Sequence, residues 1–130
     1  MLRAMMALAT ILFAAAGAQA QTYPDHPVRV IVGYAAGSGP DIQARTVSQQ
    51  LGTDLGQNFF VENRLGANGT IAARTVATAA PDGLTLLFSS SSIAPTPHVY
   101  KSLGYDTLTD LRAVATSGVL DGLLMLVDGK

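Results

Sequence analysis

The apolar positions of the first half of the chain follow two different periods. Residues 28–32 are apolar except for Arg29, which predicts a short strand covered on both faces. From Pro40 onward apolar residues recur at spacings of three and four, which predicts a helix that ends at Gly56. The apolar face of this helix is expected to consist of Ala44, Val47, Leu51 and Leu55.

The second half of the chain repeats this alternation of strands and helices. Residues 59–61 and 84–88 predict two further strands, and residues 70–79 predict a helix between them. The side of that helix expected to face the core carries Ile71, Thr75, Val76 and Ala79. A helical stretch is expected over residues 98–103, with strand candidates at 114–115 and 123–127. Strands that alternate with helices predict an α/β fold with a mainly parallel sheet.

The first twenty residues have the pattern of a secretory signal peptide. Arg3 precedes an uncharged, largely apolar run, and Ala18-Gln19-Ala20 forms a small-x-small cleavage site. The run is too short for a membrane span, although a short uncleaved anchor is the alternative. No cysteine follows the cleavage site, so a lipoprotein anchor is excluded. We therefore expect a mature chain that begins near residue 21 and resides in the periplasm.

Charge and cysteine content exclude several classes of protein. Without the signal peptide, seven basic residues stand against nine acidic ones, a net charge of −2, so no nucleic-acid partner is expected. The chain has no cysteine and therefore neither a disulfide framework nor a thiolate metal site. His26 and His98 have no Cys, Asp or Glu at ligand spacing, so neither a metal nor any other cofactor is expected.

Two polar loops are the candidate binding site. A glycine-rich turn follows the first strand and a run of four serines follows the third. The carboxyl ends of parallel strands share one edge of the sheet, where ligands bind in open α/β folds. Free backbone N–H groups at the start of a helix also suit a carboxylate or a phosphate. The candidate ligand-binding residues are Tyr34, Ala36, Gly37, Ser38, Gly39, Asp41, Ser89, Ser90, Ser91 and Ser92.

The glycine turn matches no catalytic or nucleotide-binding motif. It lacks the Gly-Lys-Ser/Thr of a Walker A loop, the third glycine of a dinucleotide fingerprint and the Gly-x-Ser-x-Gly of a nucleophile elbow. No Ser, His and Asp set can be assembled, so no catalytic residue is assigned and an enzyme is not expected. Spacing alone leaves open an ordinary strand-to-helix turn whose glycines serve only their dihedral angles.

A series of short segments runs in order across nearly the whole mature chain, at residues 23–24, 27–32, 36–42, 44–45, 61–64, 66–67, 81–87, 97–101, 105–106 and 110–111. Taken together, these segments resemble the Bug family of extracytoplasmic solute receptors of tripartite tricarboxylate transporters. The resemblance implies the Venus-flytrap fold of type II periplasmic binding proteins. It also implies a receptor that captures a small carboxylate (a di- or tricarboxylate, an amino acid or an aromatic acid) and delivers it to a membrane permease.

The resemblance further implies that backbone groups and ordered water, without a salt bridge, hold the ligand carboxylate between two loops. These loops correspond to residues 34–41 and 89–92, and neither contains Lys or Arg. Gly37 and Gly39 are expected to let the backbone approach the anion, and Ser90 and Ser91 to donate hydroxyl groups. Asp41 is expected to bond N–H groups at the helix start rather than the ligand directly. Pro40 departs from the family pattern, which usually has a hydroxyl residue there.

The chain is shorter than half of a typical family member. We therefore expect residues 21–130 to form part of the first lobe, with residues 121–130 beginning the crossover to a second lobe. Two other functions stay open at this point: a small α/β enzyme that binds a phosphate ester at the glycine turn, and a remnant that folds poorly alone. The absence of a convincing general base beside the turns favours the binding module.

Overall fold

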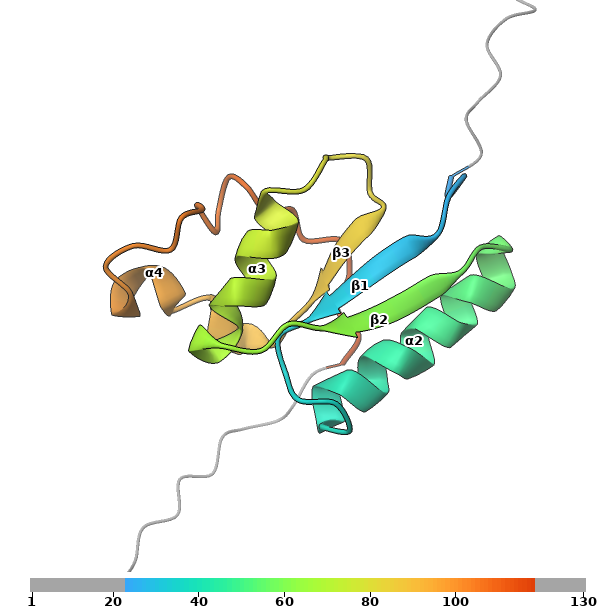
Figure 1. Cartoon of the computed structure of the whole chain (residues 1–130), viewed down its shortest axis with the longest axis horizontal. Helices are drawn as coiled ribbons and strands as arrows, with labels where there is room; N and C mark the ends of the chain where they lie inside the picture. The colour runs from blue at the N-terminus through green and yellow to red at the C-terminus, as the bar shows by residue number, and fades with distance from the viewer. Residues whose placement is uncertain (1–22, 119–130) are drawn as a thin grey trace, which may run out of the picture.

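A computed structural model of the chain describes residues 23–118 and contains a three-stranded parallel sheet. The strands are β1 (Val28–Val32), β2 (Phe59–Asn63) and β3 (Thr85–Phe88), in the spatial order β2-β1-β3. Val30 lies opposite Val61 on one side and Leu86 on the other. All three strands run in one direction, so their carboxyl ends meet at a single edge (Figure 1). The predicted α/β class and parallel sheet are confirmed.

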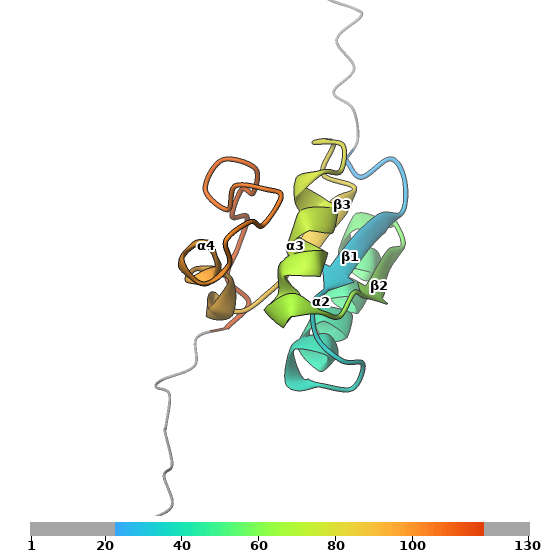
Figure 2. The same ribbon diagram turned by 60° about the vertical axis from the view of Figure 1, so that its left-hand side comes forward.

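Two helices cover opposite faces of this sheet (Figures 1 and 2). Helix α2 (Gly39–Leu55) packs against β2 and β1, and helix α3 (Thr70–Ala77) packs against β1 and β3. The side chains of β1 alternate between the two layers. Val28, Val30 and Val32 therefore pack with the α2 side, where Ala44 and Phe59 complete the buried cluster. Ile31, also fully buried, points to the α3 side.

The N-terminal helix has the predicted bounds to within one residue and only part of the predicted face. Gly56 ends α2 in the left-handed conformation (φ 68°), and its N–H donates to the carbonyl of Gly52. The buried positions are Asp41, Ala44 and Ser48, whereas Val47 and Leu55 are exposed. The expected face is confirmed at Ala44 and at Leu51, which packs against the buried cluster. It is wrong at the other two positions, because two polar residues at helical spacing, which an apolar pattern ignores, point inward.

The face and the end of α3 also differ from the prediction. Its buried residues are Thr70, Ala72 and Ala73, while Ile71 is 40% exposed. Alanines allow the helix to lie close to β1, where a bulkier residue would not fit. Gly33, just after β1, shows the same tight approach, because a Cβ there would lie 2.8 Å from the Cα of Gly69. Residue size rather than hydrophobicity therefore selects the buried face.

The remaining segments are short or irregular. The short helices are η1 (Ala67–Gly69), η2 (Ser91–Ile93) and α4 (Thr96–Val99). The helix expected over 98–103 is wrong, because the chain leaves the helical conformation at Tyr100. The strand expected at 114–115 is also wrong, since those residues are exposed and irregular. The expected signal peptide (1–20), strand (123–127) and crossover (121–130) lie outside the described residues. Within residues 23–118, no helix has the length and apolar character needed to cross a membrane.

Candidate functional site

The loop after β1 and the serine loop after β3 meet at the carboxyl edge of the sheet. The Tyr34 hydroxyl lies 2.6 Å from Ser90 Oγ and 2.9 Å from Ser92 Oγ. The two serine hydroxyls are themselves 2.9 Å apart. Two loops that are more than fifty residues apart in sequence therefore meet where the carboxyl ends of parallel strands share one edge of the sheet.

The four serines play different parts in this arrangement. Ser90 caps the short helix η2, because its Oγ accepts from the N–H of Ser92. Ser89 Oγ makes one long contact, at 3.4 Å, to the carbonyl of Ser90. Ser91 is exposed, and its side chain makes no hydrogen bond to the described residues. The hydroxyl groups that join the loops are thus those of Ser90 and Ser92.

The phenol of Tyr34 is polarised by its surroundings. Partial burial raises the pKa of the Tyr34 hydroxyl, but hydrogen bonds from Ser90 and Ser92 outweigh this effect and hold the pKa below its ordinary value. Ser38 lies four residues after Tyr34 in the sequence. Its Oγ is buried and has no hydrogen-bond partner among residues 23–118. These loops therefore present a cluster of hydroxyl groups.

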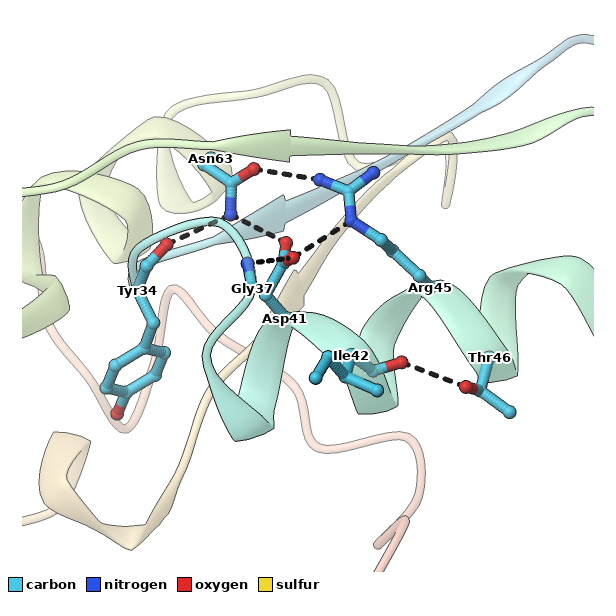
Figure 3. A network of polar contacts seen from close by, with 7 residues as sticks. All are labelled: Tyr34, Gly37, Asp41, Ile42, Arg45, Thr46 and Asn63. Carbon is cyan, nitrogen blue, oxygen red and sulfur yellow. Dashed lines mark hydrogen bonds and ion pairs between the residues drawn. The ribbon is translucent and has the colours of Figure 1, made fainter.

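The glycine turn itself is held by a buried carboxylate. Asp41 is only 1% exposed, and its Oδ2 accepts from the N–H of Gly37 at 2.8 Å and from Arg45 Nε at 2.9 Å. Its Oδ1 accepts from Asn63 Nδ2 at 2.8 Å (Figure 3). Asn63 also donates to the carbonyl of Tyr34 and accepts from Arg45 Nη2 at 3.1 Å. Both oxygens of Asp41 are therefore occupied by donors from the protein.

This network fixes the charge state of the ion pair. The Arg45 guanidinium, together with the N–H of Gly37 and the amide of Asn63, holds the pKa of Asp41 far below its usual range. Asp41 in turn raises the pKa of Arg45. Since each charge neutralises the other, the pair shapes the turn without adding net charge to the edge of the sheet.

Some backbone N–H groups of the turn already donate to acceptors within the protein, so only the others are available to a ligand. The N–H of Gly37 is used by Asp41 and the N–H of Ser38 by the carbonyl of Ala35. The N–H groups of Ala36, Gly39 and Asp41 have no acceptor within the described part of the chain. Gly37 has φ +82°, so it does require a glycine, but Gly39 begins α2 without a positive φ. A Cβ at either glycine would meet no protein atom within 4 Å.

Sequence reasoning missed Asn63 as a site residue. Asn63 is the last residue of β2. The argument that placed Tyr34 and Ser90 at the carboxyl ends of their strands would also have placed Asn63 at this edge of the sheet. Residues 23–118 contain no group of three or more His, Cys, Asp or Glu side chains that could hold a metal ion. His26 forms a surface ion pair with Asp25 at 2.9 Å.

Comparison with known proteins identifies relatives across most of the chain. The family described as "Tripartite tricarboxylate transporter family receptor" matches residues 43–127. A UPF0065 protein of Bordetella bronchiseptica is 49% identical over 111 residues, which cover 83% of this chain and 33% of the relative. Protein BugT of Bordetella pertussis is 38% identical over 120 residues, which cover 88% of this chain and 37% of BugT.

Solved structures agree with these sequence matches. The periplasmic binding protein BugD is 39% identical and superposes with a TM-score of 0.65, covering 68% of this chain and 29% of BugD. A protein of R. palustris solved with adipate is 34% identical, with a TM-score of 0.59, covering 67% of this chain and 29% of that protein. The predicted fold class is confirmed: the α/β unit is part of one lobe of a periplasmic binding protein.

The chain spans about a third of the length of the curated relatives it matches. Its family match covers well over half of its own residues, and its relatives include Bug proteins. The Bug-family resemblance of the sequence is thereby confirmed. The chain belongs to the family of tripartite tricarboxylate transporter receptors.

Proposed function

We propose that this chain supplies one ligand-binding edge of a periplasmic solute receptor that captures a small carboxylate and delivers it to a transporter permease. The observation that carries the proposal is the junction of the Tyr34 hydroxyl with Ser90 and Ser92. This junction sets two loops side by side at the edge where open α/β folds bind ligands. Family membership and the adipate-bound neighbour support the choice of a carboxylate.

The donors available at this edge suit an anion held without a countercharge. The N–H groups of Ala36, Gly39 and Asp41, which have no acceptor among residues 23–118, lie in the turn and at the start of α2. The hydroxyls of Ser90 and Ser92 lie on the serine loop. A carboxylate oxygen would accept from the N–H groups of the turn, and from Ser90 or Ser92 where that hydroxyl turns its single proton from the Tyr34 junction to the ligand. Each bond would contribute about 0.5–1.5 kcal/mol. The side chains of Asp41 and Arg45 position the turn in this scheme and do not contact the ligand.

A single lobe encloses a ligand from one side only, so water continues to compete for its oxygens. We therefore expect weak binding by this chain alone. The proposal assigns residues 21–130 to part of the first lobe. It also assigns a binding role rather than a catalytic one to the chain.

Titration of the isotope-labelled chain with adipate, followed by NMR, tests the proposal. Adipate should shift the amide signals of Gly39 and Asp41 together with those of Ser90 and Ser92. Hexane-1,6-diol has the same carbon chain without carboxylates and should leave these signals in place. Equal shifts with the diol, or shifts in neither loop, would contradict the proposal. A stronger response to inorganic phosphate would favour the phosphate-ester alternative.

A matched pair of tyrosine variants separates binding from stability. Tyr34→Phe removes the hydroxyl that joins the loops, whereas Tyr23→Phe removes a hydroxyl that donates to the carbonyl of Gly83 at 2.8 Å. Each change should lower the free energy of unfolding by about 1 kcal/mol. Adipate binding should weaken several-fold in Tyr34→Phe and stay unchanged in Tyr23→Phe. If the two variants bind adipate equally well, the Tyr34 junction is not part of the site.

A further inference from the structure

Strand β2 has a free edge within residues 23–118. It pairs with β1 on one side and with no described strand on the other. The carbonyl of Asn58 accepts from the N–H of Val28, and the N–H of Arg64 donates to the carbonyl of Val32. The even-numbered residues of this part of the chain therefore direct their backbone N–H and C=O groups toward β1. Because backbone groups alternate along a strand, Phe59, Val61 and Asn63 direct their N–H and C=O groups outward. These residues form an unpaired row able to bind an extended segment.

A groove of about 560 Å³ runs between this edge and helix α2. Its lining includes Gln49 and Thr53 from the helix and Asn58, which directly precedes the strand. Arg45 is the one charged residue among the described residues that line it, and Asp41 balances that charge. The groove therefore carries little net charge, and its lining combines these polar side chains with the apolar residues Phe59, Phe60 and Val61.

We propose that the β2 edge binds the β2 edge of a second copy of this chain. The outward row is symmetric about Val61, so an antiparallel partner places Val61 opposite Val61 and Phe59 opposite Asn63. Every outward N–H then meets a carbonyl, as a two-fold axis requires. The result is a continuous six-stranded sheet across two subunits.

The chemistry of the groove favours a second copy over an unrelated acidic or basic peptide. Side-chain amides such as Gln49 and Asn58 both donate and accept, so they can pair with the same groups of another copy. Edges that resist association commonly carry lysine or proline, and the three outward positions carry neither. Phe60, on the opposite face of β2, is 40% exposed and would be partly covered by the added strand.

Sedimentation analysis of the full chain over a range of concentrations tests this association. Val61→Pro removes an outward donor and leaves the bonds to β1 intact, a position that edge strands tolerate. Leu87→Pro is its control, because Leu87 faces outward on the opposite edge, β3. Dimers that persist in Leu87→Pro and are lost in Val61→Pro are expected. Dimers lost only in Leu87→Pro would place the interface on β3 and overturn the proposal.

A second pair of variants avoids any change to the strand. Gln49→Glu adds a negative charge inside the groove of each copy, whereas Gln43→Glu adds the same charge at an exposed helix position outside the residues that line it. The dimer dissociation constant should rise at least tenfold in Gln49→Glu and stay unchanged in Gln43→Glu. Equal effects of both variants would rule out the groove as the contact.

Hydrogen exchange of the unmodified chain provides a readout that depends on no variant. The amides of Phe59, Val61 and Asn63 should become protected as the protein concentration rises. A monomer at all concentrations, with fast exchange at these amides, would contradict the proposal. Protection that does not depend on concentration would mean that another segment of the same chain covers the edge, and the proposal would again fail.

Discussion

The buried carboxylate of Asp41 ties three separate parts of the chain together. It accepts from Gly37 in the turn, from Arg45 one helical turn further on, and from Asn63 at the end of β2. A short polar side chain near the helix start commonly bonds N–H groups there. Asp41 was expected to bond N–H groups at the helix start. It does bond a backbone N–H, but the donor is Gly37, which precedes the helix, and not a group of the first helical turn.

Asp41 should make the stability of the chain dependent on pH in the acidic range. Its pKa is lowered in the folded state, so its contribution is present above its unfolded pKa of about 3.9 and is lost as the pH falls below that value. Asp41→Asn should lower the melting temperature strongly at neutral pH. The difference from the unmodified chain should shrink as the solution is acidified.

Asp54→Asn serves as the control for this pH series. Asp54 lies exposed on the same helix and accepts one hydrogen bond, from Gln50. Its replacement should change the melting temperature little at any pH. A constant gap between the unmodified chain and Asp41→Asn throughout the acidic range would show that the charge of Asp41 is not what stabilises the fold.

Among the elements, the start of α2 separates two roles of glycine. Gly37 lies before the helix with φ +82°, while Gly39 is its first residue and lacks a positive φ. Gly37→Ala should lower the free energy of unfolding by about 1 kcal/mol, because it places a side chain in the left-handed region. Gly39→Ala should leave stability unchanged or slightly higher. Urea unfolding of both variants measures the difference.

The same two glycines sharpen the prediction for ligand binding. No protein atom lies within 4 Å of a Cβ at Gly39, so a larger residue there has room in the free protein. Gly39→Val should therefore abolish adipate binding in a chain that still folds. Retained binding in Gly39→Val would show that the ligand does not approach this part of the turn.

The bounds of an element follow from its local sequence, whereas its buried face depends on residues that are distant in the sequence. The strand at 28–32 and the helix end at Gly56 follow from local patterns and were predicted closely. The buried faces of α2 and α3 depend on partners elsewhere in the chain. Asp41, for example, turns inward because Asn63 and the turn donate hydrogen bonds to its carboxylate. The contact of Tyr34 with Ser90 was predictable, because both residues follow the carboxyl ends of parallel strands. The hydrogen bond from the N–H of Gly37 to Asp41 was not predictable from the sequence.

For the whole molecule, export should remove the first twenty residues. The prediction rests on Arg3, the uncharged run after it and the Ala18-Gln19-Ala20 site. Mass spectrometry of the protein recovered from the periplasm should show a chain that begins at Gln21. A recovered chain that retains Met1 would contradict the cleavage and favour the uncleaved anchor.

The ion pair of Arg45 with Asp41 has a consequence for how the molecule meets its ligand in solution. Arg45, which bonds the carboxylate that holds the glycine turn, is matched by that buried anion, and neither loop contributes Lys or Arg. An approaching carboxylate therefore experiences little long-range attraction from this edge, and dissolved ions have little attraction to screen. The affinity of the edge for its anion would depend on short contacts and the displacement of water. It would vary little between dilute buffer and a salt-rich environment.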